Sequence, residues 1–163
     1  MRHPKAVLFA GEKPFPILPA VDHYAGSEKL MKKALQLQKE LGPIFDITCD
    51  CEDGAHAGAE REHAEMAAAL IMSEDNLFNR VGARVHDVTH PHWRQDMEIL
   101  VGIAGRRLPF ITLPKPCSAG DVKVQIEALR EIEQNFGVDR RIPVHVLIET
   151  HGAAKTETIL KGW

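Results

Sequence analysis

Phe45-Asp-Ile-Thr-Cys-Asp-Cys-Glu-Asp-Gly54 is the stretch that decides the fold class. Successive side chains of a strand point to opposite faces, so this run separates into a polar set and an apolar set. The polar set is Asp46, Thr48, Asp50 and Glu52, and the apolar set is Phe45, Ile47, Cys49 and Cys51. A strand between two helix layers is normally apolar on both faces, whereas a barrel interior carries chemistry toward the carboxyl ends of its strands. The split therefore predicts an α/β fold of the (β/α)8 TIM-barrel type rather than an open doubly wound sheet.

Strand and helix signals alternate along the rest of the chain. Further predicted strands are 6–10, 81–86, 110–115 and about 142–149. Predicted helices are about 27–42, 57–73, 91–104 and 118–137, with Ser27 as an N-cap and Ser118 with Asp121 as a capping box. Strand and helix units of about thirty residues predict parallel strands joined by right-handed crossovers. The Gly-x-Gly-x-x-Gly motif of a Rossmann fold does not follow the first predicted strand, which weakens that alternative. We therefore expect about five of the eight barrel strands, in a single domain over 1–163 that is truncated after the fifth strand.

Composition argues against several classes of function. The chain has 163 residues, a formal net charge of −3 and no basic cluster, whereas a nucleic-acid surface needs many lysines and arginines. No apolar stretch is long enough for a bilayer and the amino terminus lacks a secretory signal, so we expect no membrane partner and a cytoplasmic location. The three cysteines predict no disulfide framework, and Cys49 and Cys51 are expected to pack as small apolar groups rather than to bind a metal.

Charged residues gather at the predicted strand ends. Asp50, Glu52 and Asp53 end the second strand, Arg84 lies at the end of the third, and Lys115 at the end of the fourth. The carboxyl ends of parallel strands open onto one shared face, so we expect these side chains near one another. Buried carboxylates need cations or hydrogen bonds, because desolvating a charge is costly. The ordinary alternative is a set of solvated surface ion pairs, which the recurrence at consecutive strand ends makes less favoured.

Glu149 ends the fifth predicted strand and offers one hard oxygen donor at the same mouth. Mg²⁺ prefers such donors and usually keeps several waters, whose places substrate oxygens can take. The sequence therefore predicts Glu149 as a metal ligand, and the barrel mouth as the candidate active site.

Four short segments resemble the motifs of one enzyme family. They are Asp50-Cys-Glu-Asp-Gly-Ala55, Ala83-Arg-Val-His86, Leu113-Pro-Lys115 and Leu147-Ile-Glu-Thr150. In order and spacing they are similar to Asp-Leu-Glu-Asp-Ala-Val, Val-Arg-Val-Asn, Leu-Pro-Lys and Ile-Glu-Thr of the citrate lyase beta subunit and malyl-CoA lyase family, within the phosphoenolpyruvate/pyruvate-domain barrels. Trp93 and Asp96 match the helix after the second motif. The chain thus resembles the N-terminal half of that family.

The resemblance implies a Mg²⁺-dependent carbon-carbon lyase. Its substrate would be a small molecule, a citryl-CoA or malyl-CoA type 2- or 3-hydroxyacyl thioester, cleaved beside a carbonyl. Arg84 would bind the substrate carboxylate and stabilise enolate charge, because a guanidinium holds that charge without giving up a proton. Glu149 would bind Mg²⁺ and meet the substrate, while Glu52 and Asp53 would order the metal's waters as part of the catalytic set. Lys115 would contact thioester phosphates or the acid group.

Departures from the family pattern leave the substrate open. His86 stands where the family usually has Asn; on the same strand face as Arg84 it would be a base or a substrate-binding donor, and the simpler interpretation is a hydrogen-bonded histidine at a strand end. Asp53-Gly-Ala-His56 is distantly similar to the Asp-Gly-Glu-His of metal-dependent pyruvate aldolases. An alternative function is therefore aldol cleavage that releases pyruvate from a non-CoA hydroxy-keto acid.

The family carries its second acidic metal ligand on a sixth strand, which we expect beyond Trp163. A third possibility is therefore a truncated, non-catalytic fragment that associates with itself, because open parallel edges and uncovered apolar surface favour association. Family members are commonly oligomers, which implies a homo-oligomer here.

Overall fold

A parallel sheet with helices on one side forms the fold in the computed structural model, which describes residues 21–54 and 57–155. The strands are β1 (Asp22–Ala25), β2 (Asp46–Asp50), β3 (Val81–Arg84), β4 (Ile111–Leu113) and β5 (Val144–Val146). The helices are α2 (Glu28–Leu41), α3 (Glu60–Met72), α4 (Trp93–Ala104) and α5 (Ala119–Asn135). Within these described stretches, no helix has both the length and the apolar character needed to cross a membrane.

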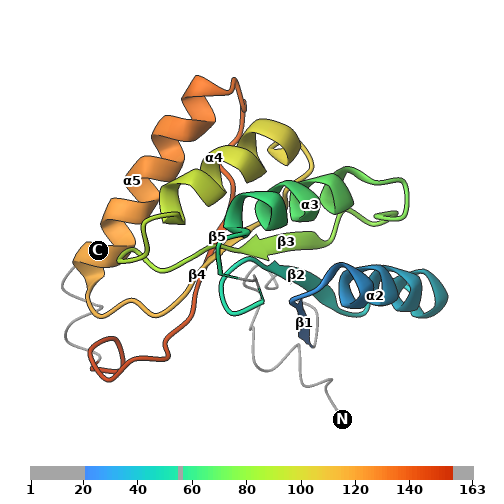
Figure 1. Cartoon of the computed structure of the whole chain (residues 1–163), viewed down its shortest axis with the longest axis horizontal. Coiled ribbons are helices and arrows are strands. Elements are labelled where there is room, and N and C mark those ends of the chain that lie inside the picture. Colours follow the sequence, from blue (N-terminus) through green and yellow to red (C-terminus); the bar gives the residue numbers. More distant parts are fainter. Residues whose placement is uncertain (1–20, 55–56, 156–163) are drawn as a thin grey trace, which may run out of the picture.

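The order of the strands in the sheet identifies the barrel class. All neighbouring strands are parallel and their order is β1-β2-β3-β4-β5. A doubly wound sheet reverses its strand order at a switch point and carries helices on both faces. Here the order never reverses, and the four helices lie along one side of the sheet (Figure 1). The predicted α/β class is therefore confirmed, as part of a TIM-barrel-type fold.

The register shows that the inner face of the sheet is polar. One row across the sheet joins Asp50, Arg84, Thr112 and His145. These side chains lie on the face away from the helices, because the alternate residues in β2 to β4 are buried in the apolar helix-facing core. The period-two split of the second strand thus separates the inside from the outside of the sheet, as predicted.

The first strand is where prediction and structure differ. The predicted strand 6–10 lies outside the described residues, and the strand that pairs with β2 is β1, Asp22–Ala25, which was not predicted. It has four residues, and of these only Ala25 is buried, so no apolar run signals it. The predicted α3 and α4 also begin too early. Gly58, with φ of 87°, lies in a turn before α3, and a turn that includes Pro91 precedes α4.

Local signals for the other two helices are confirmed. The side chain of Ser27 accepts a hydrogen bond from the Leu30 N–H and caps α2. At the start of α5, Ser118 and Asp121 form a reciprocal capping box. Both devices satisfy N–H groups that the first turn of a helix leaves without partners.

Cys49 and Cys51 pack in the apolar layer between sheet and helices, as predicted. Both are fully buried free thiols. Burial raises the pKa of the Cys49 thiol to about 12, and burial likewise raises the pKa of Cys51. Because metals and electrophiles react with the thiolate, these thiols are chemically inert at neutral pH.

Gly82 provides a test of the packed interior. A Cβ on Gly82 would lie 2.3 Å from the Phe110 ring, whereas one on Gly120 in α5 would meet only the Ser118 hydroxyl at 3.4 Å. We expect Gly82→Ala to lower the free energy of unfolding by about 1–3 kcal/mol, because overpacking displaces the ring. Gly120→Ala, the control, should be neutral or stabilise by up to about 1 kcal/mol. Urea unfolding measures both, and an unchanged Gly82→Ala midpoint would contradict the packing.

Candidate active site at the carboxyl ends of the strands

A buried arginine-carboxylate pair lies at the centre of the site. Nε of Arg84 donates to Oδ1 of Asp50 at 2.8 Å, and Nη2 donates to Oδ2 at 2.6 Å. Both side chains are only 10% exposed. The two residues are directly paired in the register of β2 and β3, so the sheet itself brings the guanidinium fork to the carboxylate. The face of Arg84 also lies 5.4 Å from the ring centroid of Tyr24 on β1, a cation-π contact.

The loop after β2 supplies two more carboxylates to the same guanidinium. Nη1 of Arg84 lies 3.0 Å from Oε2 of Glu52, and Nη2 lies 3.0 Å from Oδ2 of Asp53. Glu52 is buried, with 5% of its side chain exposed, whereas Asp53 is 62% exposed. The structure thus brings together the three predicted catalytic residues, and it leaves Asp53 as the member that solvent reaches freely.

Lys115 connects the ends of three strands. Its Nζ lies 3.0 Å from Oε1 of Glu52 and 3.1 Å from Oδ1 of Asp53, and its backbone N–H donates to Oε1 of Glu149 at 3.0 Å. Lys115 also has φ of 50°, a left-handed conformation that is uncommon for a residue with a Cβ. Such conformations are often found at functional sites. Here the conformation aims the N–H of Lys115 at Glu149 while its side chain reaches the β2 loop.

The predicted site residues carry an excess of negative charge. The cluster contains two cations and four carboxylates, namely Arg84, Lys115, Asp50, Glu52, Asp53 and Glu149. With all six ionised, the sum is two negative charges. Burial raises the pKa of Glu52, while the hydrogen bond from Lys115 holds the pKa of Asp53 below its usual value. This charge suits a divalent cation.

The charge of the cluster suits a divalent cation better than the arrangement of its oxygen donors does. Among residues 21–54 and 57–155, no three histidine, cysteine or acidic side chains are arranged as a metal-binding group. Lys115 occupies the space between the carboxylates, and Glu149 offers its oxygen to a backbone N–H. The described residues therefore fit Mg²⁺ by charge but supply only part of a ligand set, so Glu149 as a metal ligand stays a prediction.

His86 does not join the Arg84 cluster through a contact. Its Nδ1 lies 2.6 Å from Oδ2 of Asp96, in the first turn of α4, and its ring stacks on His90. The sequence named His86 as a candidate but did not reveal this pairing, because ten residues and a turn separate it from Asp96. His63 was missed entirely; its Nε2 contacts the carbonyl of Asp50 at 2.9 Å.

Two glycines let the loops after β1 and β2 touch at the mouth. A Cβ on Gly54 would lie 2.4 Å from Cα of Gly26 and 2.6 Å from the carbonyl oxygen of Asp50. Neither site tolerates a side chain without backbone movement. Gly54 closes the run that carries Asp50, Glu52 and Asp53, so the close approach fixes where that run sits.

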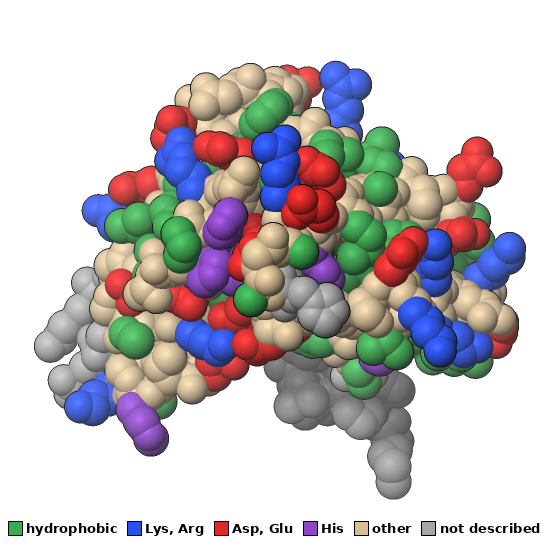
Figure 2. Space-filling model, viewed as in Figure 1, with side chains coloured by type: hydrophobic (Ala, Val, Ile, Leu, Met, Phe, Trp, Pro, Cys, Tyr) green, Lys and Arg blue, Asp and Glu red, His purple; other side chains and the backbone are tan. Residues whose placement is uncertain are grey.

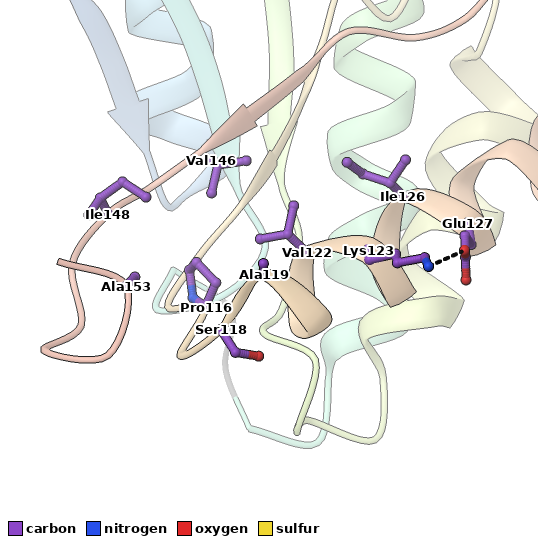
Figure 3. Close-up of a pocket in the computed structure, with 10 residues that line it drawn as sticks. All are labelled: Pro116, Ser118, Ala119, Val122, Lys123, Ile126, Glu127, Val146, Ile148 and Ala153. Carbon is purple, nitrogen blue, oxygen red and sulfur yellow. Dashed lines mark ion pairs between the residues drawn. The ribbon is translucent and has the colours of Figure 1, made fainter. Parts of the chain in front are cut away.

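An apolar cavity lies near the mouth but faces the helix layer. Its volume is about 330 Å³, and its walls include Val122 and Ile126 of α5 with Val146 and Ile148 (Figure 3). Val146 pairs in register with Leu113, whose side chain belongs to the helix-facing core. The cavity is therefore on the outer side of the sheet, away from the polar interior, and its walls are mostly apolar, with Lys123 and Glu127 paired to each other at its edge.

Several solved structures share the fold of this chain. No family model and no curated protein sequence matches the chain. Among solved structures, two complexes of a Haloferax volcanii malate synthase, one with lead(II) and one with magnesium and glyoxylate, share the fold. They superpose with TM-scores of 0.68 and 0.71 at 20% and 19% identity, over 82% and 86% of this chain and 41% and 45% of theirs.

A citrate lyase from Burkholderia xenovorans is far more similar in sequence. The identity is 49% and the TM-score 0.80, over 87% of this chain. The chain spans 44% of the length of that structure, which is less than half. This match confirms the resemblance predicted from the four motifs: the chain is similar to the N-terminal part of the citrate lyase beta-subunit family of barrel lyases.

Proposed function

We propose that the strand-end cluster is part of the active site of a carbon-carbon lyase that acts on a citryl-CoA or malyl-CoA type hydroxyacyl thioester. The observation that carries the proposal is the arrangement of Arg84. Its fork is fixed by buried Asp50, yet one of its partners, Asp53, is largely exposed. The 49% identity to a citrate lyase supports the same chemistry. Because the chain covers less than half of that relative, activity of this polypeptide is part of the proposal.

Exchange of Asp53 for substrate would open the site. The Asp53 carboxylate bridges Nη2 of Arg84 and Nζ of Lys115, at 3.0 and 3.1 Å. A substrate carboxylate has the same charge and the same planar pair of oxygens, so it can take that place when Asp53 turns into solvent. Arg84 remains held by Asp50 during the exchange. Binding therefore requires one exposed side chain to move, rather than a rearrangement of the sheet.

Arg84 then stabilises the charge that cleavage creates. Breaking a carbon-carbon bond beside a carbonyl leaves an enolate. Burial opposes the charge of Arg84, but the hydrogen bonds and negative charge of Asp50, with Glu52 and Asp53, outweigh it and raise the pKa of the guanidinium. Arg84 consequently stays charged throughout, and it neutralises the enolate without donating a proton to it.

Mg²⁺ is the cofactor proposed for this chemistry. Glu149 would hold it together with an acidic ligand from outside the described residues, and the buried Glu52, with Asp53 until substrate takes its place, would order its waters. When bound, the ion would act as a Lewis acid that polarises the keto-acid oxygen. Two findings support this proposal, the negative charge of the cluster and the magnesium and glyoxylate complex of the malate synthase with the same fold.

Aldol cleavage that releases pyruvate stays an alternative prediction. It was based on His56, which lies outside the described residues, so no contact favours it. Self-association without catalysis has structural support as a second candidate. Within the described chain, β1 and β5 have one unpaired edge each, and the apolar cavity beside α5 is uncovered. Both features favour a homo-oligomer.

Turnover tests the lyase proposal directly. With Mg²⁺ and malyl-CoA or citryl-CoA, we expect the purified chain to release the acyl-CoA product, and EDTA to stop it. Arg84→Lys keeps the charge but loses the fork, so its rate should fall at least about 100-fold. Glu149→Gln should lower the rate at least about tenfold. The control is Glu127→Gln, an exposed residue of α5 paired only loosely with Lys123. Equal background rates in all of these proteins would refute the lyase proposal for this chain.

Light scattering after size-exclusion chromatography tests self-association. Ile126 lines the apolar cavity, whereas Val124 on the same helix is exposed and is not among the cavity residues. We expect an oligomer that Ile126→Glu dissociates and Val124→Glu leaves intact, because only the first change places a charge in the apolar contact. A monomer at all concentrations tested would count against this candidate.

A further inference from the structure

His86 is held from two helices at the end of β3. One oxygen of Asp96, Oδ2, accepts both the backbone N–H of His86 at 3.0 Å and its ring Nδ1 at 2.6 Å. Gln125 of α5 donates its Nε2 to the carbonyl of His86 at 3.2 Å. A carboxylate only accepts, so Nδ1 carries a hydrogen in this pair and the ring orientation is fixed.

The remaining nitrogen of His86, Nε2, is available to a ligand. Within the described part of the chain, no hydrogen bond is formed at Nε2, and Nε2 is not among the buried polar atoms that lack a partner. Among the described residues Nε2 thus has no hydrogen-bond partner, although the residue as a whole is buried. His86 follows Arg84 by two residues, so it lies just beyond the carboxyl end of β3, at the same end of the sheet as the Arg84 cluster.

The charges around the ring decide its protonation. Burial opposes the charged form, but the hydrogen bond and charge of Asp96, followed by the charges of Glu52 and Glu60, outweigh it and raise the pKa of His86. His90 stacks on His86 with centroids 3.9 Å apart and planes inclined by 12°. Burial and the charges of His86 and His92 lower the pKa of His90. Both shifts favour the charged form of His86 over the charged form of His90.

The face of the molecule in Figure 2 shows histidine side chains gathered next to acidic ones. His90 and His92, the neighbours of His86, are partly exposed. Two stacked imidazoles cannot both be charged at low cost, and the directions of the two pKa shifts favour the charge on His86. A charged His86 ring carries an N–H at Nε2, and neutral His90, whose Nδ1 accepts from the His92 N–H, carries its own N–H at Nε2.

We propose that the charged ring of His86 donates from Nε2 to an anionic oxygen of the ligand at this mouth, with Asp96 as its positioning residue. The proposal rests on the proposed function for the class of ligand, a carboxylate or enolate of a keto acid. Arg84 and Lys115 would hold one carboxylate, and His86 would contact a different oxygen of the same molecule. A charge-assisted hydrogen bond of this kind strengthens binding of the anion only while the imidazole is protonated.

Oxalate is a suitable probe, because it carries two carboxylates and needs no turnover. NMR of the histidine rings in the wild-type chain, with MgCl₂ present, gives the pKa of His86 with and without oxalate. Linkage requires that a ligand bound through the protonated form raise that pKa. We expect oxalate to raise it. An unchanged pKa of His86, or no binding of oxalate, would overturn the proposal.

Variants separate binding from folding. By calorimetry, His86→Gln should weaken oxalate binding at least about tenfold and remove its weakening with rising pH. The control His92→Gln should keep both the affinity and the pH dependence. If His86→Gln does not fold, the wild-type NMR titration still decides. Failure of turnover with a raised pKa of His86 would refute the lyase proposal alone, and turnover with an unchanged pKa would refute the role of His86 alone.

Discussion

The buried pair of Arg84 and Asp50 is the interaction on which the rest of the site depends. A guanidinium and a carboxylate that are each only 10% exposed are tolerable because two hydrogen bonds join them. Removing either partner would leave the other charge buried and uncompensated, a costly state. β2 and β3 must therefore stay in the register that pairs them. Glu52, Asp53 and Lys115 are then arranged around a cation that cannot move.

The fold allows a small sheet to carry these charged side chains on one face. Sequential parallel strands with helices on one face leave the other face free for polar side chains, and their carboxyl ends converge. Small residues allow the convergence, since Gly26 and Gly54 touch at the loop tops and Gly82 leaves room for the Phe110 ring. The inner face of the sheet thus supports the charges at the mouth.

Sequence patterns predicted the parts of this structure that depend on local or periodic signals. Alternation in the second strand identified the polar interior, and Ser118 with Asp121 marked the start of α5. The charged strand ends could be named but not paired, because their contacts join residues 31 or more positions apart, from 31 for Arg84 with Asp53 to 62 for Lys115 with Asp53. β1 escaped prediction because only one of its four residues is buried, so no apolar run signals it. The His86 pair with Asp96 depends on how α4 packs, which no spacing encodes.

The central claim is that the strand ends form a site for the oxygens of a keto acid. Crystallography of the chain with MgCl₂ and oxalate tests it most directly. The account predicts oxalate oxygens within hydrogen-bond distance of Arg84 and Lys115, with Asp53 turned away and Asp50 still bound to Arg84. Oxalate bound elsewhere, or absent while Asp53 keeps its bridge between the two cations, would contradict the account.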